Sequence, residues 1–476
     1  MARDSTTLTT SHFRSDSIVE PMYVPALVLV WSAMQPWRVG EVALLDPQRG
    51  PFLLGRGDSS EPPIAEFAWQ RPTGLDRQPP LAGPRISRRQ LLLFPHKNQS
   101  LGVERIGRCP MIVGGNRVDK AELMPGDILE LEEQLTFWVT SRPSMLPALD
   151  ALPEHAVPCF GAADPYGIVG ESPVIWTLRE QLAFAAVANQ HVLLLGESGS
   201  GKELGALAIH ALSSRASKAM ISRNAATLPS GIIDAELFGN VRDYPNPGMR
   251  ERPGIIGEAD GSTLFLDEIG ELPHDLQAHL LRVLDAGGEY QRLGDARPRR
   301  AHLRIVAATN RDPDQLKHDL LARLTLRIRI PGLDERREDI PLLVRRLVKQ
   351  AMRASAMVGQ RFVQHFEGGH EEPRITQSLM TRMLRLAYSH HVRDLEQVLW
   401  RAMSTSRRHR IEDTPEVQEA YPVASPIVTL EQPELTPQQI RQALDAHGGN
   451  VTHTARALGL SSRFALYRLM KKWGLE

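Results

Sequence analysis

The chain has 476 residues, of which 42% are hydrophobic and 24% charged, which is typical of folded chains of about two to four domains. Lys and Arg number 56, as do Asp and Glu, so the net charge of zero excludes a uniformly basic nucleic-acid coat. Two cysteines, Cys109 and Cys159, are too few for a disulfide framework or a four-ligand zinc site and favour a reducing, cytoplasmic setting. No membrane association is expected, because the apolar run at residues 24–34 is too short to span a bilayer.

The N-terminal part is predicted to be a flexible leader followed by an all-β domain. Residues 1–22 are rich in Ser, Thr and Asp and lack the apolar core of a secretory signal. Over residues 23–142, short apolar runs recur between Gly and Pro residues, which is typical of a β-sandwich. The Pro- and Ala-rich residues 143–166 are expected to be a linker.

The rest of the chain is predicted to hold an α/β domain, a helical part and a small all-α unit. Strand and helix patterns alternate over residues 167–333, and only helical patterns follow over residues 334–411. Residues 412–434 contain four prolines and are expected to form a second linker. Residues 435–476 form a compact helical unit.

A glycine-rich loop follows the first apolar strand of the α/β domain and precedes an amphipathic helix. In this context, loop N–H groups and the helix N-terminus favour phosphate oxygens, and Lys202 can reach the β- and γ-phosphates. Glu203 stands where the generic motif has Ser or Thr, whose hydroxyl touches Mg²⁺. The alternative is a glycine-rich turn with a solvated lysine. The candidate phosphate-binding residues are Gly196, Glu197, Ser198, Gly199, Ser200, Gly201, Lys202 and Glu203.

Two further apolar strands end in polar residues that suit nucleotide hydrolysis. Residues 262–266 lead into Asp267 and Glu268, which predicts that Asp267 holds Mg²⁺ and that Glu268 polarises the attacking water. The strand at residues 304–309 ends at Asn310, which could sense the γ-phosphate. Carboxylates after strands are commonly only solvated, and the pair alone is weak evidence for a catalytic site. This interpretation is stronger because a phosphate loop lies upstream.

The C-terminal unit reads as a helix-turn-helix. Residues 436–439 form a capping box with proline at the first helical position, and Gly448 and Gly449 separate the first helix from the second. From residue 436 to the end, six Lys or Arg oppose two acidic residues, so this unit alone carries +4. The alternative is a helical hairpin that docks another protein. The candidate DNA-contacting residues are Ser462, Arg463, Tyr467, Arg468, Lys471 and Lys472.

Several motifs together resemble a known family. Residues 167–404 resemble the AAA+ domain of bacterial enhancer-binding proteins, the sigma-54-interacting transcription regulators, in which Glu commonly stands at the place of Glu203. The motifs are Ile168-Val-Gly-Glu-Ser172, residues 196–203, Asn224-Ala-Ala226, Glu236-Leu-Phe-Gly239, residues 261–273 and Ala307-Ala-Thr-Asn-Arg311. The C-terminal unit resembles the Fis-type DNA-binding domain through Gly448-Gly-Asn450 and Ala455-Arg-Ala-Leu-Gly459.

The resemblance implies an ATPase that works as a homo-oligomeric ring with ATP and Mg²⁺. It assigns phosphate binding to Lys202, Mg²⁺ binding to Asp267 and catalysis to Glu268. Asn224 matches the asparagine that restrains this glutamate, and Asn310 matches the first sensor. Arg323 matches an arginine finger that reaches the neighbouring subunit, and Arg393 matches the second sensor.

The chain departs from the family at three places. Lys317 replaces a second finger arginine, and Tyr388-Ser-His-His391 replaces Trp-Pro-Gly-Asn before Arg393. The sigma-54-contacting loop, with the family signature Gly-Ala-Phe-Thr-Gly-Ala, here reads Asp243, Tyr244, Pro245, Asn246, Pro247 and Gly248. Two prolines are expected to stiffen this loop, and Tyr244 is an aromatic residue in a different register.

The β-sandwich resembles a forkhead-associated (FHA) domain, a fold that binds phosphothreonine through its loops. The match rests on Leu54-Gly-Arg56, Ile86-Ser-Arg88 and Val113-Gly-Gly115. It implies a phosphothreonine protein or kinase as partner, contacted by Arg56, Ser87 and Arg88. Gln90 replaces the family's usual histidine, and a purely structural or phosphate-independent sandwich is the alternative.

Three functions compete. The first is a DNA-binding transcription regulator that hydrolyses ATP and acts on RNA polymerase with sigma-54. The second is an ATP-binding, DNA-binding regulator that does not remodel sigma-54 and acts as a repressor or through another polymerase form, which the altered loop favours. The third is a chaperone-type remodelling ATPase, which would not need a DNA-binding end.

Overall fold

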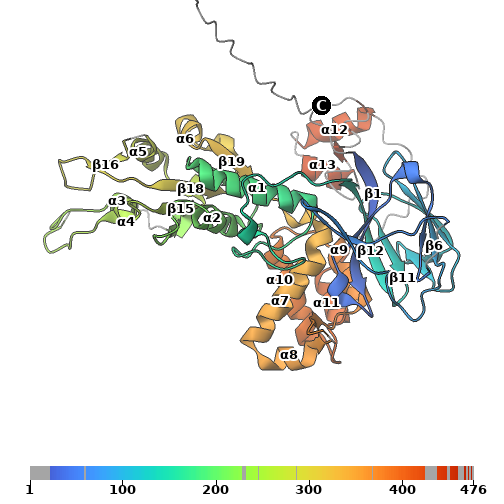
Figure 1. Cartoon of the computed structure of the whole chain (residues 1–476). Helices are drawn as coiled ribbons and strands as arrows, with labels where there is room; N and C mark the ends of the chain where they lie inside the picture. Colours follow the sequence, from blue (N-terminus) through green and yellow to red (C-terminus); the bar gives the residue numbers. More distant parts are fainter. Residues whose placement is uncertain are drawn as a thin grey trace, which may run out of the picture.

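The computed structural model describes residues 22–57, 61–227, 232–244, 246–285, 287–366, 368–423, 437–447, 451–458, 466, 467, 470 and 473. Within them, a β-sandwich is followed by a parallel α/β domain with a helical lid and by two C-terminal helices (Figure 1). No helix in these ranges is long and apolar enough to cross a membrane.

The sandwich consists of an eight-stranded sheet, in the order β5-β4-β2-β1-β12-β11-β8-β9, and a four-stranded sheet, in the order β10-β7-β6-β3. Leu27, Leu93 and Phe137 belong to the fully buried core between the two sheets. The strands are β1 (Tyr23–Ser32), β2 (Val42–Leu44), β3 (Phe52–Leu54), β4 (Ala68–Arg71), β5 (Gly74–Arg77), β6 (Leu91–Pro95), β7 (Leu101–Arg105), β8 (Met111–Val113), β9 (Asn116–Val118), β10 (Lys120–Leu123), β11 (Ile128–Leu131) and β12 (Leu135–Pro143).

Strand β1 is buried on both faces. Leu27 and Leu29 point into the sandwich core, whereas Val28 and Val30 belong to the core of the lid. Side chains alternate between the two faces of a strand, so a strand covered on both sides needs apolar residues at every position. This explains why residues 26–31 form a continuous apolar run rather than an alternating one.

The α/β domain has a five-stranded, all-parallel sheet in the order β14-β15-β18-β13-β19. Helices cover both faces: α1 and α2 pack on one, and α3 to α6 pack on the other. The elements are α1 (Pro173–Ala188), β13 (Val192–Leu195), α2 (Lys202–Ala211), β14 (Ile221–Asn224), α3 (Ile233–Phe238), α4 (Gly254–Glu258), β15 (Thr263–Asp267), α5 (His274–Leu284), β16 (Glu289–Tyr290), β17 (Arg299–Arg300), β18 (Arg304–Thr309), α6 (His318–Arg323) and β19 (Leu326–Arg329).

The lid follows β19 and contains more than the expected helices. Its elements are α7 (Ile340–Ala354), α8 (Ala356–Phe362), β20 (Val363–His365), β21 (Glu371–Pro373), α9 (Gln377–Arg385), α10 (Val392–Thr405) and α11 (Pro415–Ala420). The prediction of helices alone was wrong for the β20–β21 hairpin. Helix α11 lies in a stretch that was assigned to a linker for its prolines, but Val417 is fully buried in the lid core.

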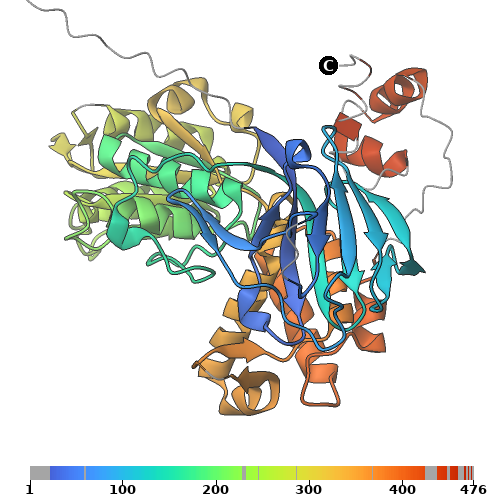
Figure 2. The ribbon, with the colours of Figure 1, turned by 45° about the vertical axis from the view of Figure 1, so that its right-hand side comes forward.

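The sandwich docks onto the lid rather than standing apart from it, as both views of the ribbon show (Figures 1 and 2). The indole Nε1 of Trp31 donates to the carbonyl of Ile375 at 3.0 Å. The side chain of Gln377 donates to Thr136 Oγ1 at 2.9 Å and accepts from the N–H of Glu133 at 2.7 Å. Apolar burial and paired polar groups therefore join the two parts into one unit.

The segment that follows the sandwich, which the sequence assigns to a linker, packs against α1. Leu146, Leu152 and Ala156 form a small core with Trp176 and Ala183. The Glu180 carboxylate accepts the N–H groups of residues 150, 151 and 152 at 2.7–3.1 Å. Both sets of contacts are made to α1, so the path from the sandwich to the α/β domain is held in place.

The C-terminal helices are α12 (Pro437–Ala446) and α13 (Val451–Ala457). Ile440, Ala455 and Leu466 form their buried core. The first two helices predicted for this unit are confirmed.

Replacing Trp31 by alanine tests the docking of the sandwich on the lid. We expect Trp31→Ala to lower the free energy of unfolding by about 2–4 kcal/mol, because it removes packed apolar area and leaves the Ile375 carbonyl without its donor. Trp400→Ala is the matched control, since Trp400 is 45% exposed on α10. Urea unfolding followed by circular dichroism measures both, and equal effects would contradict the docking.

Candidate functional site

The glycine-rich loop between β13 and α2 is shaped to surround an anion. Gly199 and Gly201 have φ angles of +80° and +105°, which glycine adopts without strain. The Ser200 side chain is 2% exposed, and its Oγ has no hydrogen-bond partner among the described residues. A buried hydroxyl without a partner is costly, so the loop fits a ligand oxygen at this point.

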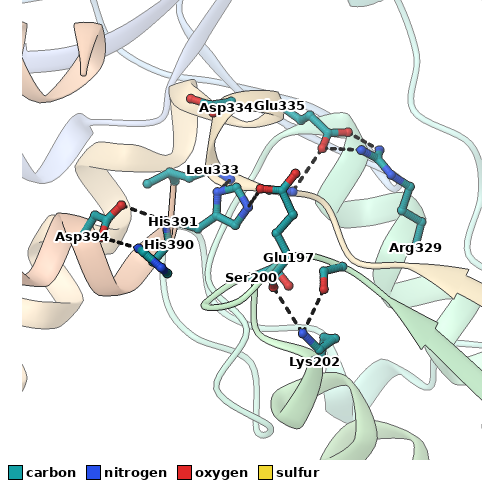
Figure 3. Close-up of polar contacts among 12 residues, drawn as sticks. Glu197, Ser200, Lys202, Arg329, Leu333, Asp334, Glu335, His390, His391 and Asp394 are labelled. Atoms are coloured by element: carbon teal, nitrogen blue, oxygen red, sulfur yellow. Dashed lines mark hydrogen bonds and ion pairs between the residues drawn. The ribbon is translucent and has the colours of Figure 1, made fainter. Parts of the chain in front are cut away.

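Lys202 begins α2 and holds its charge at the inner wall of the loop. Its Nζ donates to the carbonyls of Gly196 at 2.8 Å and Glu197 at 3.3 Å (Figure 3). The same atom lies 3.8 Å from Glu268 Oε1. The side chain is only 7% exposed. A buried ammonium beside a carboxylate and a ring of N–H groups provides the charge that a phosphate group requires.

Three neighbouring strands bring the polar residues of the site to one edge of the sheet. Strands β14, β15 and β18 are adjacent and parallel, so Asn224, Asp267 and Asn310 lie together at their carboxyl ends. Asp267 Oδ1 accepts the N–H of Glu268 at 3.0 Å, and Glu268 Oε2 accepts the N–H of Asn310 at 3.3 Å. Asn224 was expected to contact Glu268, but its amide lies 3.5 Å from Asp267 Oδ2.

The lid contributes Arg393 from the first turn of α10. Its guanidinium NH1 donates to Ser198 Oγ at 2.8 Å, so it touches the phosphate loop directly. Val392 N–H also approaches the carbonyl of Gly199, at 3.4 Å. The resemblance to a second sensor is therefore compatible with where the structure places this arginine.

Residues 332–339, here named the hinge segment, join β19 to the lid and carry charged groups that are buried. Arg336 NH1 donates to the carbonyl of Val169 at 3.2 Å, and its NH2 lies 3.5 Å from the carbonyl of Ser200. Asp339 accepts the N–H groups of Glu171 at 2.7 Å and Ser172 at 3.1 Å, and also the Ser172 hydroxyl at 2.5 Å. Burial lowers the pKa of Arg336 despite the nearby Asp339.

The loop, the strand ends and the lid enclose a cavity of about 550 Å³. Its polar lining residues include Lys202, Asn224, Asp267, Glu268 and Arg393. Apolar side chains also line it, some of them from α7. A lining that combines phosphate-binding groups with apolar side chains suits a nucleotide, whose base is flat and poorly solvated. The other lining residues include Ile168, Val169, Leu178, Leu343, Arg346, Leu347 and Gln350.

Several of these residues were not found from the sequence. Arg336 stands in a run of charged residues, Asp-Glu-Arg-Arg-Glu-Asp, which by itself predicts a solvated surface. Arg346 and Gln350 are i, i+4 neighbours on α7, and that spacing places them on one helix face. The i, i+4 spacing of Arg346 and Gln350 could have been used to place them on one helix face. Nothing in the sequence indicated that the charged run at residues 334–339 is buried.

Magnesium fits the donors at the strand ends. Asp267 and Glu268 are oxygen ligands beside the phosphate loop, and Mg²⁺ prefers one or two carboxylates together with water and phosphate oxygens. The expected assignment of Mg²⁺ to Asp267 is compatible with this placement.

Arg323 lies apart from the residues that line the cavity. Its Nε donates to Asp285 Oδ1 at 2.6 Å, and the side chain is 37% exposed. The Asp285 carboxylate raises the pKa of Arg323, so the guanidinium stays charged. Lys317 lies at the N-terminus of the same helix, α6.

The loop at residues 243–248 is closed by its own hydrogen bonds. Asp243 N–H donates to the Met249 carbonyl at 2.9 Å, and Gly248 N–H donates to Asp243 Oδ1 at 2.7 Å. A Cβ on Gly294 would lie 2.6 Å from Tyr244 Cγ, so this ring packs on the loop between β16 and β17. Asn246 and Pro247 are exposed, and Pro245 lies outside the described residues.

The described residues predicted to contact a phosphopeptide or DNA are not among the residues that line the cavity. Arg56 and Arg88 are exposed on two sandwich loops that are joined by the N–H of Arg56 and the carbonyl of Ser87, at 3.2 Å. Ser87 Oγ accepts the N–H of Arg108 at 3.0 Å. Tyr467 is 49% exposed. Ser462, Arg463, Arg468, Lys471 and Lys472 lie outside the described residues.

Comparison with known proteins matches both the α/β domain and the C-terminal helical unit to protein families. Residues 168–333 match the Sigma-54 interaction domain, and residues 437–473 match the Fis family of bacterial regulatory proteins. The transcriptional regulatory protein GlrR of Escherichia coli K12 is 32% identical over 363 residues, which cover 74% of this chain and 78% of GlrR. The chain belongs to the sigma-54-interacting transcription regulators.

Two other proteins are also similar to this chain. The anaerobic nitric oxide reductase transcription regulator NorR of Aeromonas hydrophila subsp. hydrophila is 36% identical over 337 residues, 65% of this chain and 63% of NorR. The crystal structure of NtrX from Brucella abortus in complex with ATP has 28% identity and a TM-score of 0.45, over 64% of this chain and 69% of NtrX. For this sigma-54-interacting regulator, the predicted AAA+ domain and Fis-type helix-turn-helix are therefore confirmed.

Replacing Asp339 by alanine tests the hinge segment of this sigma-54-interacting regulator. We expect Asp339→Ala to lower the free energy of unfolding by about 3 kcal/mol, because three donors at Glu171 and Ser172 lose their acceptor. Asp76→Ala is the matched control on the exposed strand β5, where about 0.5 kcal/mol or less is expected. Urea unfolding midpoints measure both, and a control-like effect of Asp339→Ala would contradict the hinge's role.

Proposed function

We propose that this protein is a sequence-specific DNA-binding transcription regulator that binds and hydrolyses ATP in the cavity between the parallel sheet and the lid. The observation that carries the proposal is that Lys202, Asp267, Glu268 and Arg393 line the same cavity, with Lys202 Nζ 3.8 Å from Glu268 Oε1. These residues come from the loop, a strand end and the lid, and the chemistry of phosphoryl transfer needs all of their charges together.

Each residue has a defined task in this proposal. Lys202 and Arg393 neutralise phosphate charge, and Asp267 holds Mg²⁺, which shields the phosphates when bound. Glu268 orients the attacking water and accepts its proton. Its carboxylate is held by the N–H of Asn310 at 3.3 Å, a contact that keeps the base directed at the site. Asn224 supports Asp267 rather than Glu268 in this arrangement.

Completion of the site by a neighbouring subunit is part of the proposal. Arg323 does not line the cavity of its own chain among the described residues, and it is held outward by Asp285. An arginine in this position suits a finger that reaches the site of the next subunit in a homo-oligomeric ring. Arginine is better suited than lysine to this role because its planar group can make two parallel bonds, so Lys317 is expected to contribute less.

The C-terminal unit supplies DNA binding. Helices α12 and α13 form a compact pair, and the chain from residue 436 onward carries a net charge of +4. In the proposed mode, Ser462, Arg463, Tyr467, Arg468, Lys471 and Lys472 contact the DNA. A phosphate contact from a lysine positions the protein, whereas Arg463 contacts base edges.

The sandwich is proposed to receive a signal as an FHA-type phosphothreonine-binding domain. Arg56 and Arg88 are exposed on loops that the backbone bond between Arg56 and Ser87 holds together, and Arg56 Nε donates to the carbonyl of Ile86 at 2.5 Å. Two arginines on one edge offer charge-assisted bonds to phosphate oxygens, and the partner would be a kinase or its phosphorylated target. Ser87 already accepts the N–H of Arg108, so its hydroxyl can still donate to phosphate.

The altered loop favours a regulator that does not remodel sigma-54 productively. In the family, a Phe-Thr pair at a mobile tip meets the sigma factor. Here the loop bonds to itself, and Tyr244, which is 42% exposed, contacts the neighbouring loop at Gly294. Transcriptional effects would then come from DNA binding or from another polymerase form.

Glu268→Gln tests the assignment of hydrolysis. We expect it to keep ATP binding and to reduce turnover about 100-fold or more, because the general base is removed while the phosphate loop is intact. Glu258→Gln, on the exposed end of α4, is the matched control and should leave turnover unchanged. Wild-type turnover per subunit should also fall on dilution, because Arg323 acts on a neighbour. Full activity of Glu268→Gln would show that the site has been assigned wrongly.

In vitro transcription from a linked promoter tests the output. With ATP, we expect no open complex from sigma-54 holoenzyme in the presence of this protein, because the loop lacks the Phe-Thr tip. The main sigma holoenzyme on the same template is the comparison. ATP-dependent open complexes with sigma-54 would contradict the proposal, and their loss in Tyr244→Ala would show that Tyr244 takes the place of the missing phenylalanine.

A further inference from the structure

The lid meets the phosphate loop through a histidine that the family signature does not contain. His391 immediately precedes α10 and has φ +48° and ψ −114°, a conformation that costs energy for a residue with a side chain. His391 is 3% exposed, and its ring lies between the hinge segment and the phosphate loop (Figure 3). Such strain persists only where the surrounding contacts hold it.

The ring of His391 has a defined hydrogen-bond direction. Its Nδ1 lies 3.2 Å from the N–H of Leu333, in the hinge segment. An N–H donates, so Nδ1 must accept and cannot carry a proton. The proton of the neutral ring is therefore on Nε2, which lies 3.4 Å from Glu197 Oε2 in the phosphate loop and makes no hydrogen bond among the described residues. One ring thus contacts the hinge with one nitrogen and faces the loop with the other.

The surrounding backbone leaves no room for the ring to move away. A Cβ on Gly332 would lie 2.6 Å from the ring Cε1, so the hinge accepts this ring only because residue 332 is glycine. A Cβ on Gly199 would collide with the carbonyl of His390, so the phosphate loop is in direct contact with the peptide before His391. Arg393, two residues further on, bonds Ser198.

We propose that His391 is a positioning residue of the nucleotide site, whose neutral ring ties the hinge segment to the phosphate loop and holds the lid over the phosphates. This inference rests on the proposed binding of ATP in the same cavity. His391 touches neither the water nor the phosphates in this role. It acts by placing Glu197, Ser198 and Arg393 relative to one another.

The charges around His391 set the direction of its pH dependence. Glu197 faces it from the phosphate loop, Asp334, Glu335 and Arg336 from the hinge segment, and His390, Arg393 and Asp394 lie on its own element. Burial is the largest influence and lowers the pKa of His391 from its ordinary 6.5, although Glu197 acts in the opposite direction. A proton on Nδ1 would also oppose the N–H of Leu333. The closed lid is therefore favoured above pH 6.5 and is lost as the pH falls below it.

His391→Asn tests this role in the full chain. Asparagine adopts positive φ angles more readily than most residues with a side chain, but it cannot reach both Leu333 and Glu197. We expect the Kd of a fluorescent ATP analogue with Mg²⁺ to rise about 3- to 10-fold at pH 8, which corresponds to a coupling of the size typical for a positioned polar contact. The wild-type Kd should rise further between pH 7.5 and pH 5.5 than the Kd of the variant does. His409→Asn, an exposed histidine of the lid, is the matched control and should behave as the wild type.

The outcomes separate this inference from the proposed function. If the wild type does not bind the analogue at any pH, the proposed function fails. If it binds and His391→Asn has the same Kd and a parallel pH profile, only the role of His391 is overturned. Should His391→Asn not fold, hydrogen–deuterium exchange at the C2 position of histidines in the wild type decides instead. A pKa of His391 below 6.5 that decreases further with the analogue supports the role, and a pKa at or above 6.5 overturns it.

Discussion

The buried charges of the hinge segment are the constraint on which the arrangement of the other parts depends. A charge that leaves water costs several kcal/mol unless it is paired and hydrogen-bonded. Arg336 donates to the carbonyls of Val169 in the cavity wall and Ser200 in the phosphate loop. Asp339 accepts the N–H of Glu171, just before α1. Glu338 pairs with Arg142 of the sandwich at 3.1 Å, and this pair opposes the rise in the pKa of Glu338 that burial causes. The partners of Arg336 and Asp339 belong to the α/β domain and the partner of Glu338 belongs to the sandwich, so satisfying the hinge fixes the positions of the α/β domain, the lid and the sandwich together.

The same constraint makes the sandwich part of the nucleotide site's surroundings. Arg71 of β4 pairs with Glu171 at 3.0 Å, only two residues after the pocket-lining Val169. Glu171 is buried and also accepts the N–H of Gly161, which together with Arg71 opposes the rise of its pKa on burial. With the shared core around Val28 and Val30, these pairs give a physical route by which an event at the sandwich could alter the lid.

The sequence was sufficient where local pattern and chemistry coincide. The phosphate loop and the strand ends at Asp267 and Asn310 followed from short motifs with strict spacing, and the structure brings these residues to one edge of the sheet. Arg393 was assigned from the family resemblance, and the structure places it against Ser198 of the phosphate loop. The docking of the sandwich could not be predicted, because the apolar run of β1 indicates burial on both faces without naming the partner. The burial of the hinge segment was also missed. Arg336 and Asp339 are charged residues of the kind usually found at the surface, and they are buried only through contacts with residues far away in the sequence. The β20–β21 hairpin was missed because strands of three residues carry almost no periodic signal.

Hydrogen exchange of backbone amides in the full chain, with and without a non-hydrolysable ATP analogue and Mg²⁺, tests the central claim that the hinge couples the nucleotide cavity to the sandwich. The coupling predicts slower exchange at the phosphate loop and at residues 332–339. It also predicts slower exchange at the strands of the sandwich that face the lid, β1 and β12, because one set of buried pairs holds all of them. Protection confined to the phosphate loop and the sheet, with unchanged exchange in the hinge segment and in β1 and β12, would contradict it.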